Sequence, residues 1–378
     1  MKRYVYFDEA ATSLPKPECV RRAMYDALDM LGNPGRSGHD LSYRAAMEIF
    51  ECRKSVSRLF GCDKPERVVF TYNATYALNM AIKGYARPGS HILISNLEHN
   101  SVIRPVHALS KEREQGITYS VFDATGSTND LLYDFSSKIR PNTRMAIVTL
   151  ASNVTGKILP VASIASICRK RGILLVCDAS QAAGCVPINV PSLGIDVLCF
   201  AGHKGLYGPQ GVGGALFYTD IEPKAILEGG NGMHSADKNM LGSLPERLEP
   251  GTLGTPGICG LNAGIGYVTK IGIGEIYERN KMLIDRLTEA LAAIKDVRVY
   301  GVCEHRTPTL IFNKKGLPSE EASERLNESG YCVRGGFHCA PLAHAALQTG
   351  EYGAVRASLS FGNTTKQIDA FARFVEKM

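Results

Sequence analysis

A lysine and an aspartate that lie 26 positions apart carry the clearest chemical signal in the sequence. Lys204 follows the apolar run 197–200 within a Gly-His-Lys-Gly motif, and Asp178 follows the strand-like run 173–177. A confined lysine amine with a lowered pKa can attack an aldehyde, and the neighbouring glycines permit tight turns around it. An acid at the end of a buried strand can keep the ring nitrogen of pyridoxal phosphate protonated, which lets the ring accept electrons. The pair therefore predicts chemistry at the α-carbon of an amino acid.

Each of these residues alone has an ordinary explanation. A lysine beside glycines is usually a solvated turn residue, and an aspartate after an apolar run is usually a helix cap or a loop residue. The ordered string is more specific, because Asp178 and Gln181 precede a second strand-like run, Lys204 follows it, and a glycine-rich hairpin comes next at 211–214. We therefore favour the cofactor interpretation of the whole motif.

Further motifs continue this pattern almost from end to end of the chain. They are Tyr6 to Thr12, Phe70 to Thr75, Glu98 to Asn100, Ser152 to Gly156, Glu249 to Thr252, Arg334 to Pro341 and Val355 to Ser358. In this order they resemble the class V aminotransferase-fold enzymes, and specifically the group II cysteine desulfurases, which include selenocysteine lyases. The resemblance implies an α/β protein of the aspartate-aminotransferase-like fold type I, with a mainly parallel sheet and a smaller α+β C-terminal domain.

The hydrophobic pattern agrees with this architecture. Strand-like runs are expected at 67–71, 91–95, 118–122, 145–150, 173–177, 197–200 and 215–218, and helical stretches such as 74–86, 101–115 and 161–171 lie between them. Short apolar strands that alternate with helices indicate a mainly parallel sheet covered on both faces. Ligands of such sheets bind at the carboxyl ends of the strands, where Asp178 and the residues before Lys204 fall.

The pattern changes after Gly257, where a long helix over 274–294 is followed by short strands and helices. We therefore expect a large cofactor-binding domain over residues 18–257. The small domain should comprise residues 258–378 together with residues 1–17, which the resemblance places beside it. The glycine-rich region 229–247 is expected to form a loop and is the best candidate for a mobile flap at the mouth of the site.

Composition narrows the class of protein. The chain has 378 residues, 44% of them hydrophobic, and its net charge of +6 comes from scattered basic residues, so a nucleic-acid partner is not expected. No segment reaches about 18 uninterrupted apolar residues, so a membrane is not expected either. The 11 cysteines lack spacing suited to a metal site, and their odd number indicates a reduced protein. The N-terminus shows no signal peptide. We expect a cytoplasmic protein without a metal.

The resemblance also assigns cofactor contacts. It implies that His99 stacks on the pyridoxal ring, Asn153 approaches its side, Asp178 pairs with the ring nitrogen and Gln181 binds the phenolic oxygen. From Glu98-His99-Asn100 alone, His99 would be an ordinary half-buried histidine.

For the phosphate, the resemblance implies contacts from backbone at Ala74, from Thr75 and His203, and from Thr252 of a neighbouring subunit, which makes the protein a homodimer. Thr75 could instead be part of a simple helix cap. Ala201 departs from the family, in which a phosphate-binding serine is common at this position.

Two further residues are expected to act on the substrate. Arg356 can bind the amino-acid carboxylate through parallel hydrogen bonds, or it can form an internal salt bridge with a nearby acid. The resemblance singles out Cys339 as the nucleophile that forms a persulfide, and His338 beside it could favour the thiolate. The chain carries Phe337 where many relatives carry a histidine.

The sequence therefore predicts a cysteine desulfurase that converts L-cysteine to L-alanine, with catalytic residues Lys204, Cys339 and His99. A sulfur-acceptor protein is an expected partner. A selenocysteine lyase, which releases selenide from L-selenocysteine, is the alternative within the class. A catalytically silent sulfur carrier or regulatory scaffold is the alternative outside it.

Overall fold

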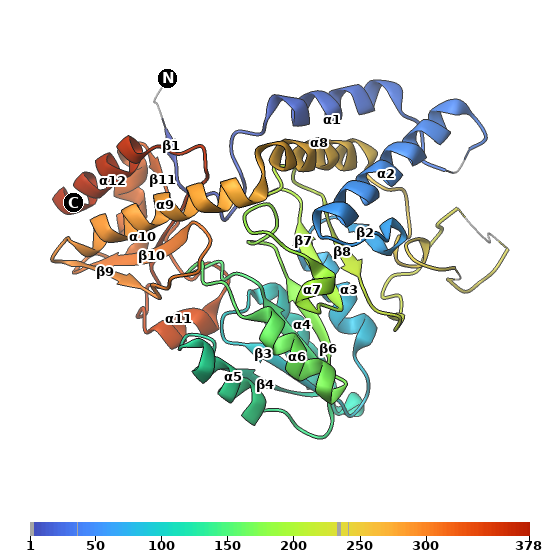
Figure 1. Cartoon of the computed structure of the whole chain (residues 1–378), viewed down its shortest axis with the longest axis horizontal. Helices are drawn as coiled ribbons and strands as arrows, with labels where there is room; N and C mark the ends of the chain where they lie inside the picture. Colours follow the sequence, from blue (N-terminus) through green and yellow to red (C-terminus); the bar gives the residue numbers. More distant parts are fainter. Residues whose placement is uncertain (1–3, 36, 233–235, 241) are drawn as a thin grey trace.

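A seven-stranded sheet lies at the centre of the larger part of the molecule (Figure 1). The computed structural model describes residues 4–35, 37–232, 236–240 and 242–378. The strands follow the order β2-β8-β7-β6-β5-β3-β4, and all neighbours pair in parallel except β8, which runs antiparallel to both β2 and β7. The strands are β2 (Val68–Thr71), β3 (His91–Ser95), β4 (Thr118–Phe122), β5 (Thr143–Thr149), β6 (Leu174–Asp178), β7 (Val197–Ala201) and β8 (Gly213–Phe217). The predicted mainly parallel sheet is confirmed.

Helices bury both faces of this sheet, as continuous apolar strands require. In β6, Leu175 and Cys177 face one hydrophobic cluster, whereas Leu174 and Val176 face the other. The first cluster includes residues of α2 (Asp40–Leu59), α5 (Thr128–Ser137), α6 (Val161–Arg171), α7 (Val190–Leu193) and α8 (Thr255–Ile271). The second includes residues of α3 (Ala74–Tyr85) and α4 (Asn100–Lys111). Helix α1 (Glu18–Met30) lies along α8 (Figure 1).

The smaller domain has its own core beside this sheet. Its antiparallel sheet has the order β12-β10-β9, and strand β1 pairs in parallel with β11, so β1 lies beside this domain. The strands are β1 (Val5–Tyr6), β9 (Val297–Tyr300), β10 (Thr309–Lys314), β11 (Tyr331–Cys332) and β12 (Val355–Ser358). The helices are α9 (Ile273–Ala292), α10 (Ser319–Glu328), α11 (Pro341–Leu347) and α12 (Thr365–Lys377).

The packing of helix α8 indicates where the boundary between the two domains lies. The boundary expected after residue 257 falls inside α8, whose buried residues Ile258, Leu261 and Val268 belong to the core of the large sheet. Helix α9 instead contributes Leu283 and Leu287 to the core of the small domain. We propose that the boundary lies near Gly272, between the two helices.

Part of the predicted flap over 229–247 cannot be compared, because residues 233–235 and 241 lie outside the described residues. In its described remainder, regular secondary structure begins only at Glu246, the first residue of a short 3-10 helix. Among the helices of the described ranges, none has the length and apolar character needed to cross a membrane.

Candidate active site

A cavity of about 250 Å³ lies at the carboxyl ends of the parallel strands. It brings together most of the predicted residues from distant parts of the sequence: Ala74, Thr75, His99, Asn153, Asp178, Gln181, His203, Lys204 and Arg356. Ala201, Arg334 and His338 line it as well. Thr252 lines a different cavity, together with Tyr72 and Leu227.

Lys204 is partly buried in this cavity, and its backbone is held tightly. Burial lowers the pKa of its amine from 10.5 to about 8, against the opposing attraction of Asp178. The carbonyl of His203, the preceding residue, accepts hydrogen bonds from Lys16 Nζ at 2.7 Å and from Ser13 N at 3.1 Å. Gly205 permits a close approach, because a Cβ atom there would lie 2.4 Å from the carbonyl oxygen of Ala183. An amine held in this way is suited to attack an aldehyde.

Asp178 ends β6 and is 3% exposed. Its Oδ1 accepts hydrogen bonds from the backbone N–H of Ser180 at 2.8 Å and from the Ser180 hydroxyl. These bonds fix the orientation of a carboxylate that lines the cavity, as a partner for a ring nitrogen requires. Gln181, one turn further, donates from its amide to the carbonyl of Ala10 at 3.0 Å.

His99 caps the N-terminus of α4. Its Nδ1 accepts from the backbone N–H of Ser101 at 3.1 Å, and burial lowers the pKa of the imidazole to about 4. The ring is therefore neutral near pH 7, and because Nδ1 accepts, the proton resides on Nε2. A neutral, flat ring fixed at a helix end is suited to lie against an aromatic cofactor.

The start of α3 forms the other end of the cavity. Asn73 caps the helix, because its side chain accepts a hydrogen bond from Tyr76 N at 2.9 Å. The capping residue is therefore Asn73 and not Thr75. Ala74 and Thr75 occupy the first helical turn, where unpaired N–H groups and the helix dipole favour an anion. Gly213 allows β8 to pass closely, because a Cβ atom there would lie 2.9 Å from Ala74 N.

Arg356 projects from β12 and is 2% exposed. Its Nη2 donates to Asp8 Oδ1 at 2.8 Å and its Nη1 donates to the carbonyl of Asn153 at 3.2 Å. The internal salt bridge that the sequence left as an alternative is therefore present, and Asp8 was not foreseen as a site residue. Arg356 Nε is buried and has no hydrogen-bond partner among the described residues. The guanidinium thus keeps unused donors at a cavity-lining position.

Cys339 lies in a short loop beside the cavity and is half-buried. Its carbonyl accepts from Asn100 N at 2.7 Å, and the preceding carbonyl of His338 accepts from Asn153 Nδ2 at 2.8 Å. Its Sγ lies 4.0 Å from Arg334 Nη2. By contrast, the thiols of Cys52, Cys177 and Cys199 are fully buried in the core. Cys339 therefore has the setting of a reactive thiol.

The expectation that His338 favours the thiolate is wrong. Both ring nitrogens are engaged elsewhere, Nδ1 with His344 and Nε2 with the carbonyl of Arg334, each at 3.0 Å. Burial and the positive charge of Arg356 hold the pKa of His338 far below its usual range. A neutral imidazole with both nitrogens engaged offers neither a positive charge nor a free hydrogen bond to the Cys339 sulfur, and the cation that approaches this sulfur is Arg334.

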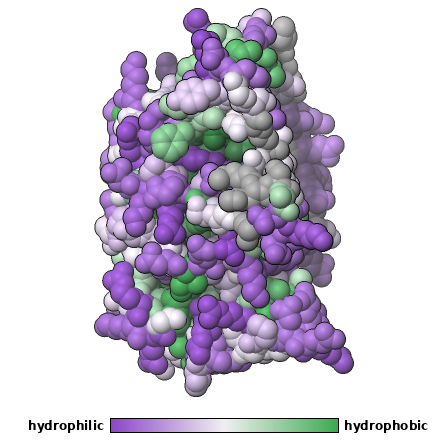
Figure 2. All heavy atoms as spheres, turned by 90° about the vertical axis from the view of Figure 1, so that its right-hand side faces the viewer, coloured by the Kyte–Doolittle hydropathy of each residue, from purple (hydrophilic) through white to green (hydrophobic). Residues whose placement is uncertain are grey.

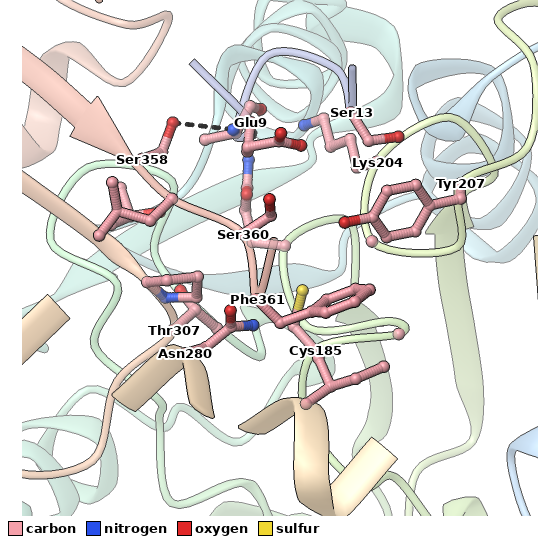
Figure 3. A pocket seen from close by; sticks show the side chains of 18 residues that line it. Glu9, Ser13, Cys185, Lys204, Tyr207, Asn280, Thr307, Ser358, Ser360 and Phe361 are labelled. Carbon is pink, nitrogen blue, oxygen red and sulfur yellow. Dashed lines mark hydrogen bonds between the residues drawn. The ribbon is translucent and has the colours of Figure 1, made fainter. Parts of the chain in front are cut away.

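A second, small cavity of about 30 Å³ lies behind Lys204, where the two domains meet. Figure 3 shows the hydroxyl of Tyr207 directed toward Ser360, with Glu9 above them. The Tyr207 ring packs against Phe361 with centroids 5.8 Å apart, and burial raises the pKa of Glu9 to about 8. The loop that carries Lys204 and Tyr207 is thus packed against the small domain as well as against the large sheet.

The cavity fits pyridoxal phosphate. A buried carboxylate, an amine with a lowered pKa, a neutral imidazole and the N–H groups at a helix start surround one space. These groups match a pyridine nitrogen, an aldehyde, an aromatic face and a phosphate, respectively.

Comparison with known proteins gives a consistent result. The family model Aminotransferase class-V matches residues 5–371. The chain is 32% identical to a "Probable cysteine desulfurase" of Methanothermobacter thermautotrophicus, an alignment that covers 100% of this chain and 95% of the relative. It is 31% identical to a "Probable cysteine desulfurase" of Mycolicibacterium paratuberculosis, but it spans only 56% of that longer protein.

Two solved structures are also similar. The apo structure of cysteine desulfurase from Thermococcus onnurineus superposes with a TM-score of 0.91 at 33% identity, over 99% of this chain and 94% of that one. The cysteine desulfurase CsdA from Escherichia coli, in an S-sulfonic acid form, superposes with a TM-score of 0.89 at 27% identity and the same coverage.

Proposed function

The chain belongs to the class V aminotransferase family, and we propose that it is a cysteine desulfurase that uses pyridoxal phosphate. It converts L-cysteine to L-alanine and retains the sulfur on Cys339 as a persulfide. The observation that carries this proposal is the fixed position of the Cys339 thiol beside Arg334, at the edge of the cavity that holds Lys204 and Asp178.

The cofactor contacts follow the lining of the cavity. Lys204 would bind the aldehyde, Asp178 the ring nitrogen and Gln181 the phenolic oxygen, with His99 against the ring and Asn153 at its side. The first turn of α3, including Ala74 and Thr75, would hold the phosphate with His203. Bound pyridoxal phosphate supplies an electron sink for the charge that develops at the substrate α-carbon.

The residues of the chain orient the substrate and move its proton. Arg356 binds the amino-acid carboxylate through the donors that Asp8 and Asn153 leave free. This contact directs the Cα–H bond toward Lys204. With a pKa of about 8, the Lys204 amine is in part neutral near pH 7 and can remove that proton.

Cys339 then takes the sulfur. Its thiolate, with the Arg334 guanidinium beside it, attacks the substrate sulfur. The new S–S bond forms while the substrate Cβ–S bond breaks, and the electron pair of the broken bond stays with the organic fragment. That fragment becomes alanine after it takes up protons.

Surface features support the proposed partners. Large apolar side chains are exposed along α1 and α2: Tyr25, Leu28, Met30, Leu41, Tyr43, Met47 and Phe50. Figure 2, which views the face that carries α2, shows apolar groups between polar ones. An exposed apolar surface of this kind supports a homodimer, in which Thr252 would reach the phosphate of the neighbouring subunit. Phe337, 45% exposed next to Cys339, would contact a sulfur-acceptor protein.

A reducing compartment suits the thiols. All of the cysteines are described and none forms a disulfide, which supports the proposed cytoplasmic location.

The test is alanine formation from L-cysteine by the holoenzyme with a thiol reductant present. The Cys339→Ala variant should form no alanine from cysteine but should still bind the cofactor. In the wild type, mass spectrometry without reductant should find one added sulfur atom on the Cys339 peptide. Desulfuration by the variant at the wild-type rate would refute the assigned nucleophile, and absence of alanine with the wild type would refute the function.

Selenocysteine should be compared in the same assay. The relatives described above are named as cysteine desulfurases or probable cysteine desulfurases, so the comparison does not favour the selenocysteine lyase alternative.

A further inference from the structure

Three buried side chains form a hydrogen-bonded row beneath the Cys339 loop. His338 Nδ1 lies 3.0 Å from His344 Nε2, and His344 Nδ1 lies 2.9 Å from Thr349 Oγ1. At the other end, His338 Nε2 lies 3.0 Å from the carbonyl oxygen of Arg334. The three residues are 2%, 1% and 6% exposed, respectively. His344 lies on α11, and Thr349 follows the end of that helix.

The direction of the hydrogen bonds in this row is determined. A carbonyl only accepts, so His338 Nε2 carries the proton and, in the neutral ring, Nδ1 accepts. His344 Nε2 must then donate, His344 Nδ1 must accept, and the Thr349 hydroxyl donates to it. Both rings stay neutral because burial and the charge of Arg356 lower both pKa values, with Arg334 adding to the effect at His338. The edge of Phe337 packs on the His344 ring, with centroids 5.4 Å apart.

The row ends on a strained part of the backbone. His338 and Cys339 have φ angles of 50° and 56°, in the left-handed region that side-chain-bearing residues rarely adopt. Arg334 makes two contacts here. Its carbonyl accepts the hydrogen bond from His338 Nε2, and its side chain approaches the Cys339 sulfur. Arg334 also forms two backbone hydrogen bonds with Arg356. The N–H of each residue donates to the carbonyl of the other.

We propose that His338, His344 and Thr349 are positioning residues for the Cys339 nucleophile. The row holds two consecutive residues in the left-handed conformation and ties Arg334 to the loop, so that the thiol and its cation keep their places beside the cavity. The inference deepens the proposed function and rests on Cys339 being the sulfur acceptor. An ordinary buried histidine pair would stabilise the fold without any particular effect on this thiol.

The test replaces His344 in the holoenzyme. His344→Leu leaves His338 Nδ1 without its donor, whereas His344→Gln keeps an N–H that can reach it. Because small misplacements of a reacting group cost on the order of 100-fold, we expect the leucine variant to lose about 10- to 100-fold in the rate of sulfur transfer from cysteine. The glutamine variant should retain distinctly more activity.

A second measurement separates positioning from general damage. Exchange of the substrate α-proton with deuterated solvent uses Lys204 and Arg356 but not Cys339. It should remain within about twofold of the wild type in His344→Leu, since independent sites act nearly additively. Equal loss of proton exchange and of sulfur transfer would overturn the proposal, as would equal loss in the leucine and glutamine variants.

The matched control is His91→Leu. His91 is another fully buried histidine whose ring nitrogens both have side-chain partners, Thr143 at 2.8 Å and Ser120 at 3.0 Å, but it lies on β3. Its loss should lower the melting temperature and leave the ratio of sulfur transfer to proton exchange unchanged. A change in that ratio as large as that of His344→Leu would overturn the proposal.

Alkylation of Cys339 by iodoacetamide provides a readout that needs no turnover. With the loop released, the half-buried thiol should react several-fold faster in His344→Leu than in the wild type. If the wild type makes no alanine, the proposed function fails. The alkylation rate still tests whether the histidine row positions Cys339. An unchanged alkylation rate in the leucine variant would refute the positioning role by itself.

Discussion

Replacement of Lys204 by methionine should stabilise the cofactor-free protein while it abolishes turnover. Methionine is unbranched and apolar, so it removes the charge while it keeps most of the packing. Burial lowers the pKa of Lys204 from 10.5 to about 8, which corresponds to a cost of about 3 kcal/mol while the amine is charged. The entropy of unfolding for a chain of this length is about 0.8 kcal/mol/K, so the melting temperature should rise by about 4 °C near pH 7.

The sign of the pH dependence follows from the two pKa values. Below about pH 8 the amine is charged in the folded and unfolded states alike, and the wild type bears the full cost. Between pH 8 and 10.5 the unfolded chain binds a proton that the folded protein does not, so the wild type gains stability relative to the variant. The advantage of the variant should therefore shrink over this window and be absent above it.

Differential scanning fluorimetry of both apoproteins across this pH range is the assay. The exposed lysine variant Lys170→Met is the control and should melt like the wild type at every pH. A Lys204→Met variant that melts at or below the wild-type temperature at pH 7 would refute the proposed cost of burying the charged Lys204 amine. A stability advantage of the variant that does not depend on pH would refute it as well.

Three other changes test separate parts of the site. Arg356→Ala should raise the KM for cysteine about 10- to 100-fold through lost charged hydrogen bonds; it should also lower the melting temperature, because Asp8 loses its partner. An unchanged KM would make Arg356 purely structural. Asp178→Asn should retain bound cofactor, judged by absorbance, but lose most of kcat; full activity would contradict its role at the ring nitrogen. Burial raises the pKa of Glu98 to about 8, so wild-type stability should fall as pH rises from 4.5 to 8. Glu98→Gln should flatten that part of a melting-temperature profile, and an unchanged slope would contradict it.

The elements of the large sheet could be predicted well from the sequence. The bounds predicted for β3 and β4 match the structure, because short apolar runs between helices have few other conformations. No helix was predicted for α1 or α2. Their surfaces carry exposed apolar residues such as Leu28 and Tyr43, which blur the pattern that distinguishes a buried face from a solvated one.

The site could be predicted where its residues follow strand ends or begin helices. Asp178 and Lys204 come together for this reason, as the topology of a parallel sheet requires. The partners of Arg356 and His338 could not be predicted in the same way. Asp8 lies 348 positions from Arg356, and the histidine row depends on how α11 packs beneath the loop. Such contacts follow from tertiary packing, on which spacing in the sequence carries little information.

The N-terminal segment connects the two halves of the active site. Asp8 binds Arg356 in the small domain, and Ser13 and Lys16 bind the carbonyl of His203 next to Lys204 in the large domain. Arg356, which we propose to orient the substrate, and Lys204, which we propose to remove its proton, are therefore held by residues only a few positions apart in the chain. Because catalytic geometry depends on their relative placement, this short segment fixes a distance that neither domain sets alone.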